Sequence, residues 1–246
     1  MPPTDLTGLP AVIELRQYTL RPGRRDELVA LFDREFIEPQ EELGMIVLGQ
    51  FRDLDDPDRF VWLRGFRDMT ARHRGLTDFY GGDVWARHGP RANDTMIDSD
   101  DVLLLRPLPT GSGFTCSPSG RPADGAPAPD RFVDATLWSF PPGRQDGIAL
   151  IRDGLLPVLL ETGPAPLALL ITEHAHNDFP RLPVRSGENV VAILTSYPDE
   201  TAHRRHLTDV RAHPLARGEL LPAIEREQTA APRRLRLAPT GRSLIS

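Results

Sequence analysis

The sequence predicts an α+β protein made of two tandem β-α-β-β-α-β units that close together into one barrel. The chain contains an internal repeat. Gly23 in YTLRPGRRD corresponds to Gly143 in WSFPPGRQD, and the segment that begins at Phe60 has its counterpart in the segment that begins at Val191. A stretch rich in Gly and Pro separates the two copies, and each copy alternates between strand and helix periodicity. We therefore expect a first unit over residues 11–108, a linker over 109–130 and a second unit over 131–240.

The first copy begins with a strand in which Ile13 and Leu15 share one face and Glu14, Arg16 and Tyr18 the other. A turn at Pro22-Gly23 leads to a helical stripe, and Gly44 ends that helix. Asp68 or Thr70 is the expected N-cap of the second helix. The predicted elements in order are Val12–Leu20, Arg25–Leu43, Met45–Phe51, Arg59–Phe66, Asp68–Tyr80 and Val102–Arg106.

The second copy repeats this order with an insertion around Phe179–Ser186. Three prolines in and after the insertion, Pro180, Pro183 and Pro198, favour a rigid covering loop or dimer arm. The predicted elements are Phe132–Phe140, Asp146–Glu161, Leu167–His174, Asn189–Tyr197, Glu200–His213 and Arg234–Leu237.

This element order is typical of a ferredoxin-like unit, an antiparallel sheet with both helices on one face. The other face needs a cover, since a single unit would leave an aromatic-rich surface in water. Two units in one chain can cover each other, so we expect an intrachain barrel with a cavity between the two sheets.

Composition excludes several classes of function. The 246 residues carry 29 basic and 35 acidic side chains, a formal net charge of −6 that favours neither nucleic acid nor an anionic membrane as partner. Every basic residue is arginine, which excludes a Schiff-base lysine and the lysine of a phosphate-binding loop. The single cysteine, Cys116, is expected to be an exposed thiol in the linker. With no membrane span or signal-peptide pattern, we expect a cytoplasmic protein.

Several blocks of the sequence resemble a known family. They are ELRQYTLRPG (Glu14–Gly23), FRDLDDPDRFVWLRGF (Phe51–Phe66), FYGGDVWARHG (Phe79–Gly89), TMIDSDDVLLLRP (Thr95–Pro107) and NDFPRLPVRSGENV (Asn177–Val190). They are similar to the NIPSNAP family of the dimeric α+β barrel superfamily, in its bacterial tandem-domain type. The resemblance implies the fold and the tandem arrangement. The wider superfamily contains cofactor-free monooxygenases, polyketide-modifying cyclases, haem-dependent enzymes and ligand binders, so the fold leaves the activity open.

The polar faces of two strands form the first candidate site. If Ile13, Leu15, Val61 and Leu63 pack on the helices, then Glu14, Arg16, Tyr18, Trp62 and Arg64 line the cavity between the sheets. Buried charges require partners, so Glu14 is expected to pair with Arg16 or Arg64. The alternative is that this ion pair only stabilises the barrel. In the second copy Asp134, Thr136 and Trp138 replace Glu14, Arg16 and Tyr18, while Ile193, Thr195 and Tyr197 replace Trp62, Arg64 and Phe66, which places the site in the first half.

Histidines supply the remaining candidates. His88, close to Tyr80, Trp85 and Asn93, is the expected acid/base group because imidazole titrates near neutral pH. His174 and His176 would share one face of a strand, an arrangement that makes them candidate metal ligands. Asn177 and Arg181 lie in the insertion. His206, Asp209 and His213 are expected on a solvated helix face.

These residues predict an enzyme without cofactor that acts on an aromatic or polyketide-like metabolite by proton transfer or oxygenation. The expected catalytic set is His88, Arg16, Arg64 and Glu14, in which an arginine holds an oxyanion and His88 moves the proton. The expected substrate-binding set is Tyr18, Trp62, Tyr80, Trp85, Asn93, His174, Asn177 and Arg181. The alternatives are a ligand-binding or scaffold protein, and a metal or haem enzyme that uses His174, His176 or His88. A small-molecule ligand is the expected partner, and a homodimer is possible.

Overall fold

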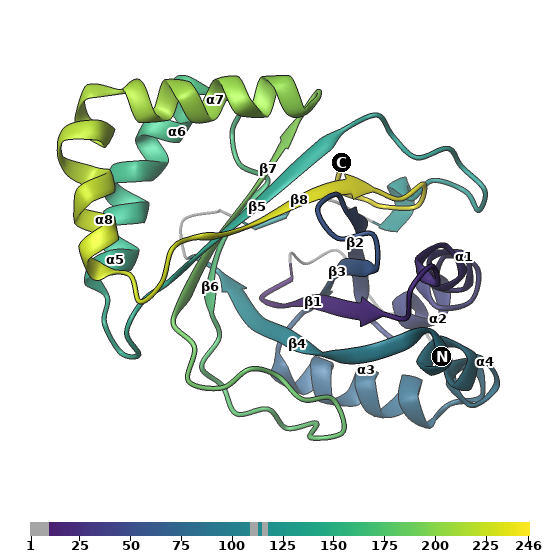
Figure 1. Cartoon of the computed structure of the whole chain (residues 1–246). Coiled ribbons are helices and arrows are strands. Elements are labelled where there is room, and N and C mark those ends of the chain that lie inside the picture. Colours follow the sequence, from purple (N-terminus) through teal and green to yellow (C-terminus); the bar gives the residue numbers. More distant parts are fainter. Residues whose placement is uncertain (1–9, 109–112, 115–117) are drawn as a thin grey trace.

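The structure is a computed structural model that describes residues 10–108, 113–114 and 118–246 (Figure 1). Strands and helices alternate in both halves, as the periodicity predicts. The N-terminal half contains β1 (Val12–Leu20), α1 (Arg25–Glu35), α2 (Ile37–Glu42), β2 (Ile46–Asp53), β3 (Arg59–Phe66), α3 (Met69–Gly81), α4 (Asp83–Thr95) and β4 (Met96–Pro107).

The C-terminal half has the same alternation, with two π-helical segments, η2 and η3, inside its helices. It contains η1 (Pro118–Gly120), β5 (Phe132–Ser139), α5 (Asp146–Ala149), η2 (Leu150–Leu155), α6 (Leu156–Thr162), β6 (Ala168–Thr172), β7 (Val190–Tyr197), α7 (Glu200–Ala212), η3 (Ala216–Leu220), α8 (Leu221–Glu227) and β8 (Arg233–Pro239). None of the helices in the described part of the chain is both long enough and apolar enough to cross a bilayer.

The strands of the described residues form a closed barrel in the order β1-β3-β2-β8-β5-β7-β6-β4. Each half contributes four adjacent strands, and the halves join where Phe51 of β2 pairs with Pro239 of β8 and where Leu105 of β4 pairs with Thr172 of β6. The helices lie outside the barrel in two groups, α1–α4 beside the N-terminal strands and α5–α8 beside the C-terminal ones (Figure 1). The α+β class and the closed barrel are therefore confirmed.

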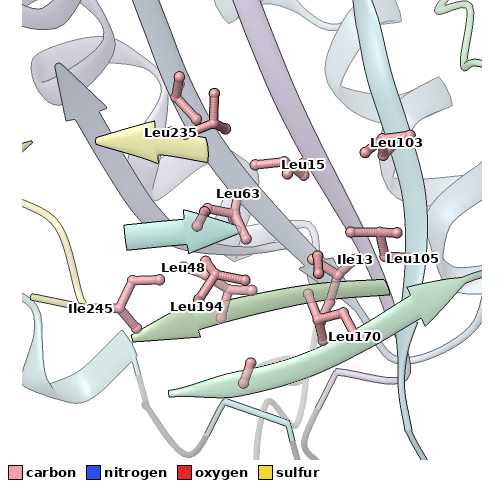
Figure 2. Close-up of a cluster of buried hydrophobic side chains, with 14 of the residues drawn as sticks. Ile13, Leu15, Leu48, Leu63, Leu103, Leu105, Leu170, Leu194, Leu235 and Ile245 are labelled. Atoms are coloured by element: carbon pink, nitrogen blue, oxygen red, sulfur yellow. The ribbon is translucent and has the colours of Figure 1, made fainter. Parts of the chain in front are cut away.

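The inside of the barrel is filled by apolar side chains from both halves. Ile13, Leu15, Val61 and Leu63 belong to this buried cluster together with Leu103, Leu105, Leu170, Leu194 and Leu235 (Figure 2). The expectation that these four residues pack on the helices, and that the polar set faces the barrel interior, is wrong. Glu14, Arg16, Tyr18, Trp62 and Arg64 are buried on the opposite face, which α1–α4 cover. Strand alternation groups side chains by face, but it does not decide which face lies toward the helices.

Several element boundaries differ from the prediction for local reasons. The expected helix Arg25–Leu43 is interrupted at Phe36, between α1 and α2. Helix α4 was not predicted, because Gly89 and Pro90 lie inside it and are typical of loops. The N-cap prediction is confirmed: the carboxylate of Asp68 accepts a hydrogen bond from Ala71 N at 2.7 Å.

The expected linker is more closely packed than its composition suggests. Cys116 lies outside the described residues, but Phe114 is 1% exposed and belongs to the cluster inside the barrel. Farther along, Arg121 forms an ion pair with Glu41 and donates to Val47 O at 2.6 Å and to Arg242 O at 2.7 Å. The described part of this segment is thus anchored to the N-terminal half and is not a simple surface connection.

The apolar interior predicts a large difference between two leucine substitutions. We expect Leu63→Ala, at a fully buried position inside the barrel, to lower the free energy of unfolding by about 2–5 kcal/mol, because it removes packed methyl groups and leaves a cavity. Leu54→Ala, at a position 49% exposed, is the matched control and should change it by less than about 0.5 kcal/mol. Denaturant titration measures both values, and equal effects would contradict the buried position of Leu63.

Candidate functional site

The antiparallel pairing of β1 with β3 brings the polar residues of the two strands together. Glu14 lies opposite Arg64, and Arg16 lies opposite Trp62. Cross-strand partners in such pairs point to the same face, so both strands present their charged and aromatic side chains to α1–α4. The predicted ion pair is confirmed, since Glu14 contacts both Arg16 and Arg64.

One carboxylate binds three guanidinium groups, and we call Glu14, Arg16, Arg64 and Arg72 the Glu14 cluster. All four side chains are fully buried. Glu14 Oε2 accepts from Arg16 Nη1 at 2.9 Å and from Arg64 Nη2 at 2.6 Å and Nε at 3.2 Å. Glu14 Oε1 accepts from Arg72 Nε at 2.8 Å. These charge-assisted bonds fix the carboxylate from two sides.

A loop of the C-terminal half completes the cluster. Arg72, on α3, donates through Nη1 to Asn177 Oδ1 at 3.0 Å and to Asp178 Oδ1 at 3.1 Å. The following Phe179 is buried against the N-terminal apolar cluster. Asn177 was a predicted site residue, and the structure brings it to the Glu14 cluster, whereas Arg72 was not predicted.

The Glu14 cluster holds more positive than negative charge. Burial alone would raise the pKa of Glu14, but Arg64, Arg16 and Arg72 outweigh burial and hold that pKa well below its usual range. Glu14 is therefore ionised, and its single negative charge faces three guanidinium groups, with the partly exposed Asp178 as the next carboxylate. Excess positive charge in a buried place favours an anion, or a group that becomes anionic, nearby.

An aromatic pocket adjoins the cluster between the sheet and the helices. Its walls include Tyr18, Phe32, Phe36, Trp62, Phe79, Tyr80 and Trp85, together with the amide of Gln40. Neighbouring rings meet mostly edge to face, as between Tyr18 and Trp62 with centroids 6.0 Å apart. The volume open to the centre of a water molecule is about 20 Å³. Tyr18, Trp62, Tyr80 and Trp85 are therefore gathered in one place, as the sequence suggested, but outside the barrel.

Two hydrogen-bond donors of this pocket have no acceptor in the part of the chain that the structure describes. Tyr18 Oη accepts from Arg16 Nε at 2.9 Å, which leaves the hydroxyl proton of Tyr18 available. Burial raises the pKa of Tyr18 although Arg16 opposes this, so the phenol is neutral near pH 7. Trp62 Nε1 is buried and has no hydrogen-bond partner among the described residues. Both residues line the pocket.

Three predicted residues lie away from this cluster. His88 Nε2 is 3.4 Å from Glu35 Oε2 in a partly exposed pair between α4 and α1, and His88 is not among the residues that line the aromatic pocket. Asn93 is exposed on α4. Arg181 is exposed, and its guanidinium group lies 6.0 Å from the ring centroid of Phe179.

His174 and His176 do not share a strand face, because β6 ends at Thr172. Both are exposed in the loop that follows and line a wide depression with Glu173, Gly143 and Arg185. Within residues 10–108, 113–114 and 118–246, no group of three or more His, Cys, Asp or Glu side chains is arranged to hold a metal ion.

The C-terminal half carries buried polar groups that were assigned to a solvated surface. His206 is buried on α7, where its Nδ1 lies 2.7 Å from Tyr197 Oη, so the expectation of a solvated face for His206 is wrong. His203, also buried on α7, was not singled out. The internal repeat could have drawn attention to Arg72 and His203. Both follow an alanine at the same position of the matching segments TARHRGLTD and TAHRRHLTD, so the two basic residues are equivalent in the two copies.

Comparison with known proteins places the N-terminal half in a family. Residues 13–111 match the model of the NIPSNAP family, so this segment is a NIPSNAP domain, as the resemblance of its sequence blocks indicated. None of the curated proteins matches the chain.

Solved structures share the fold of the whole chain at low identity. A "putative monooxygenase" from Fusobacterium nucleatum is 9% identical with a TM-score of 0.61, covering 97% of this chain and 96% of its own. An anthrone oxidase-like protein is 12% identical with a TM-score of 0.59, covering 96% and 94%. A "putative monooxygenase" from Lactobacillus acidophilus is 13% identical with a TM-score of 0.54, covering 94% of each chain. At these identities the likeness concerns the fold alone.

The Glu14 cluster predicts a severe effect of removing one charge. We expect Glu14→Gln to lower the free energy of unfolding by about 3–5 kcal/mol, because three buried guanidinium groups lose their shared counter-charge. Glu42→Gln, at the exposed last position of α2, is the control and should change it by less than about 0.5 kcal/mol.

The same variant has a defined dependence on pH. The pKa of Glu14 is lower in the folded than in the unfolded state, so its contribution is complete above the unfolded value and is lost as pH falls through the folded one. The difference in unfolding free energy between wild type and Glu14→Gln should be constant from about pH 7 to pH 5 and shrink below about pH 4. A difference that shrinks between pH 7 and pH 5 would contradict the assigned shift.

Proposed function

We propose that this NIPSNAP protein is a cofactor-independent enzyme of biosynthesis that acts on an aromatic or polyketide-like metabolite. The reaction is proton transfer or oxygenation at a carbon conjugated to an oxygen of the substrate. The site is the aromatic pocket between β1, β3 and α1–α4. The fold shared with an anthrone oxidase-like protein and with monooxygenase-like structures supports the class of substrate.

One observation carries this proposal: two lining residues of the aromatic pocket have hydrogen-bond donors without an acceptor, and a buried positive cluster lies beside them. Among the described residues neither Tyr18 Oη–H nor Trp62 Nε1–H has an acceptor, and Arg16 Nε lies 2.9 Å from Tyr18 Oη. The guanidinium of Arg64 lies 5.0 Å from the ring centroid of Trp62. Preorganised donors backed by positive charge stabilise an enolate or phenolate oxygen more than they stabilise the neutral carbonyl or phenol.

The roles of the residues follow from their positions. Tyr18 and Trp62 bind the oxygen that becomes negative, while Tyr80 and Trp85 contact the flat faces of the substrate. Arg16, Arg64 and Arg72 supply the field, and Glu14 holds them in place. Tyr18 donates a hydrogen bond to that oxygen, and the proton that leaves the substrate carbon passes to solvent water, so in this proposal water takes the proton-transfer role expected of His88.

The two halves are proposed to be duplicated ferredoxin-like units. The N-terminal strands follow the order β4-β1-β3-β2 and the C-terminal strands the matching order β8-β5-β7-β6. Asp68 and Asp199 cap equivalent helices through hydrogen bonds to Ala71 N and Ala202 N, both at 2.7 Å. Equal strand order and equal caps support a common origin of both units.

A second candidate, a ligand-binding or scaffold protein, is favoured by the small free space of the aromatic pocket. A volume of about 20 Å³ for the centre of a water molecule accommodates about one water. A substrate with several rings therefore requires the helices α1–α4 to move outward from the sheet. If they do not move, the Glu14 cluster stabilises the fold and the chain has no turnover there.

Anthrone oxidation tests the enzymatic proposal directly. Anthrone and dioxygen give anthraquinone and water, a balanced reaction that passes through the enolate of anthrone. We expect the chain to accelerate this reaction, and Tyr18→Phe to lower kcat/KM by about 10²–10³-fold, because one donor to the oxyanion is lost. An oxygen electrode and the absorbance of anthraquinone measure the rate.

Two controls separate catalysis from loss of fold. Thr208→Val removes an exposed hydroxyl from α7, at the far side of the barrel, and should leave the rate unchanged. Trp62→Phe removes the second donor and should also slow the reaction. A rate equal to that of the uncatalysed reaction in a folded wild-type chain would favour the scaffold.

A further inference from the structure

A second cavity lies between the sheet and the helices of the C-terminal half. Its apolar walls come from Trp138 of β5, Ile193 of β7 and Leu155 and Val210 of the helices. The volume open to the centre of a water molecule is about 80 Å³, larger than the 20 Å³ of the aromatic pocket. This cavity belongs to the other half of the barrel and does not enter the proposed function.

A buried carboxyl group, that of Asp134, lines this cavity. Asp134 is 6% exposed and lines the cavity from β5. Its Oδ2 accepts from Thr136 Oγ1 at 2.5 Å. Its Oδ1 lies 3.3 Å from His203 Nε2, but the two atoms are not oriented as a hydrogen bond, and Oδ1 has no other partner in the described part of the chain. Thr136 is thus the one hydrogen-bond donor to this carboxyl group among the described residues, and a hydroxyl group of a ligand in the cavity would supply a second.

The repeat explains why this acceptor is open. Asp134 occupies the position of Glu14, and His203 that of Arg72, so a carboxyl group on the first strand again faces a basic group on the helix. Thr136 and Thr195 stand where the first half has Arg16 and Arg64. Loss of two guanidinium groups removes the donors that saturate Glu14 and also empties the space that their side chains would fill.

A second acceptor follows from the hydrogen bonds of His206. Thr162 Oγ1 donates to Val158 O at 2.7 Å. The proton of Thr162 is therefore engaged, so Thr162 Oγ1 accepts a hydrogen bond from His206 Nε2–H at 3.1 Å. Burial lowers the pKa of His206, which is neutral near pH 7 and accepts through Nδ1 from Tyr197 Oη at 2.7 Å. The hydroxyl proton of Tyr197 is therefore donated to His206. The oxygen of Tyr197, which lines the cavity, can still accept a hydrogen bond.

We propose that the C-terminal cavity binds a small neutral aromatic alcohol or phenol, whose hydroxyl group donates to Asp134. The apolar walls take the ring, Asp134 accepts from the hydroxyl group, and Tyr197 Oη offers a further acceptor. Arg211 and Arg234 line the cavity with exposed side chains, which disfavours a cationic amine. His203 is a positioning residue that holds the carboxyl group of Asp134.

The distribution of tryptophans gives a direct readout. Trp62 and Trp85 line the aromatic pocket, whereas Trp138 lines the C-terminal cavity. Fluorotryptophan incorporated into the whole chain gives fluorine resonances that single Trp→Phe variants assign. Phenol and toluene are the probes, because they have the same shape and differ in the hydroxyl group.

We expect phenol to shift the resonance of Trp138 saturably and to bind about tenfold more tightly there than toluene, because only phenol donates to Asp134. Asp134→Leu should abolish this preference, while Asp153→Leu, at an exposed position of η2, should keep it. Val210→Phe, which fills the cavity, should abolish the phenol shift at Trp138 and leave Trp62 and Trp85 unchanged.

Three results would overturn the inference: no phenol shift at Trp138, equal affinities for phenol and toluene in the wild type, or an unchanged phenol shift in a folded Val210→Phe variant. If Asp134→Leu does not fold, the wild-type comparison and Val210→Phe decide. Shifts confined to Trp62 and Trp85 would also overturn it and would leave the proposed function intact. Loss of anthrone oxidation alone would not affect the C-terminal site.

Discussion

The single carboxylate of Glu14 opposes three guanidinium groups in a place that water does not reach. A closed barrel with an apolar interior leaves one face of each strand for polar side chains, and in the N-terminal half that face lies under α1–α4. The arginines must therefore be buried beneath the helices, where among the described residues they donate to Glu14, Gln40, Tyr18, Asn177, Asp178 and the carbonyl oxygen of Ser99. The donors of the aromatic pocket, Tyr18 and Trp62, lie on this same face of the strands, and the arginines provide the positive charge beside them. The contact between Arg72 and the loop of the C-terminal half also ties the two units together.

The two halves share one plan but differ in hydrogen-bonding character. In the N-terminal half the strand carboxylate is saturated by arginines, and the adjoining pocket presents donors from Tyr18 and Trp62. In the C-terminal half the equivalent carboxyl group is short of donors, and the cavity presents acceptors from Asp134 and Tyr197. In our two proposals, a few substitutions at matching positions thus convert a site for a developing anion into one for a neutral hydroxyl group. Specificity of this kind depends on which polar groups would remain unpaired with the wrong ligand.

Much of the fold can be predicted from the sequence, because strand alternation and the repeat are strong signals. The bounds of β1 and β3, the Asp68 cap and the pairing of Glu14 with arginine all agree with the structure. The direction of the polar face could not be predicted, because Leu15 and Trp62 are both apolar enough to be buried on either side. Arg72 and His203 were missed, and His206 was placed on a solvated face, because all three lie on Arg-rich helices, where a buried polar residue resembles a solvated one in sequence. Only the helices' contacts with the sheet distinguish the two cases.

The central claim is that the chain binds aromatic substrates between the sheet and the helices, and not within the barrel. A crystal structure of the wild-type chain soaked with anthraquinone tests this most directly. Our account predicts electron density between β1, β3 and α1–α4, with one quinone oxygen within hydrogen-bond distance of Tyr18 Oη and Trp62 Nε1. Density inside the barrel, among Leu15, Leu63 and Leu105, would contradict it.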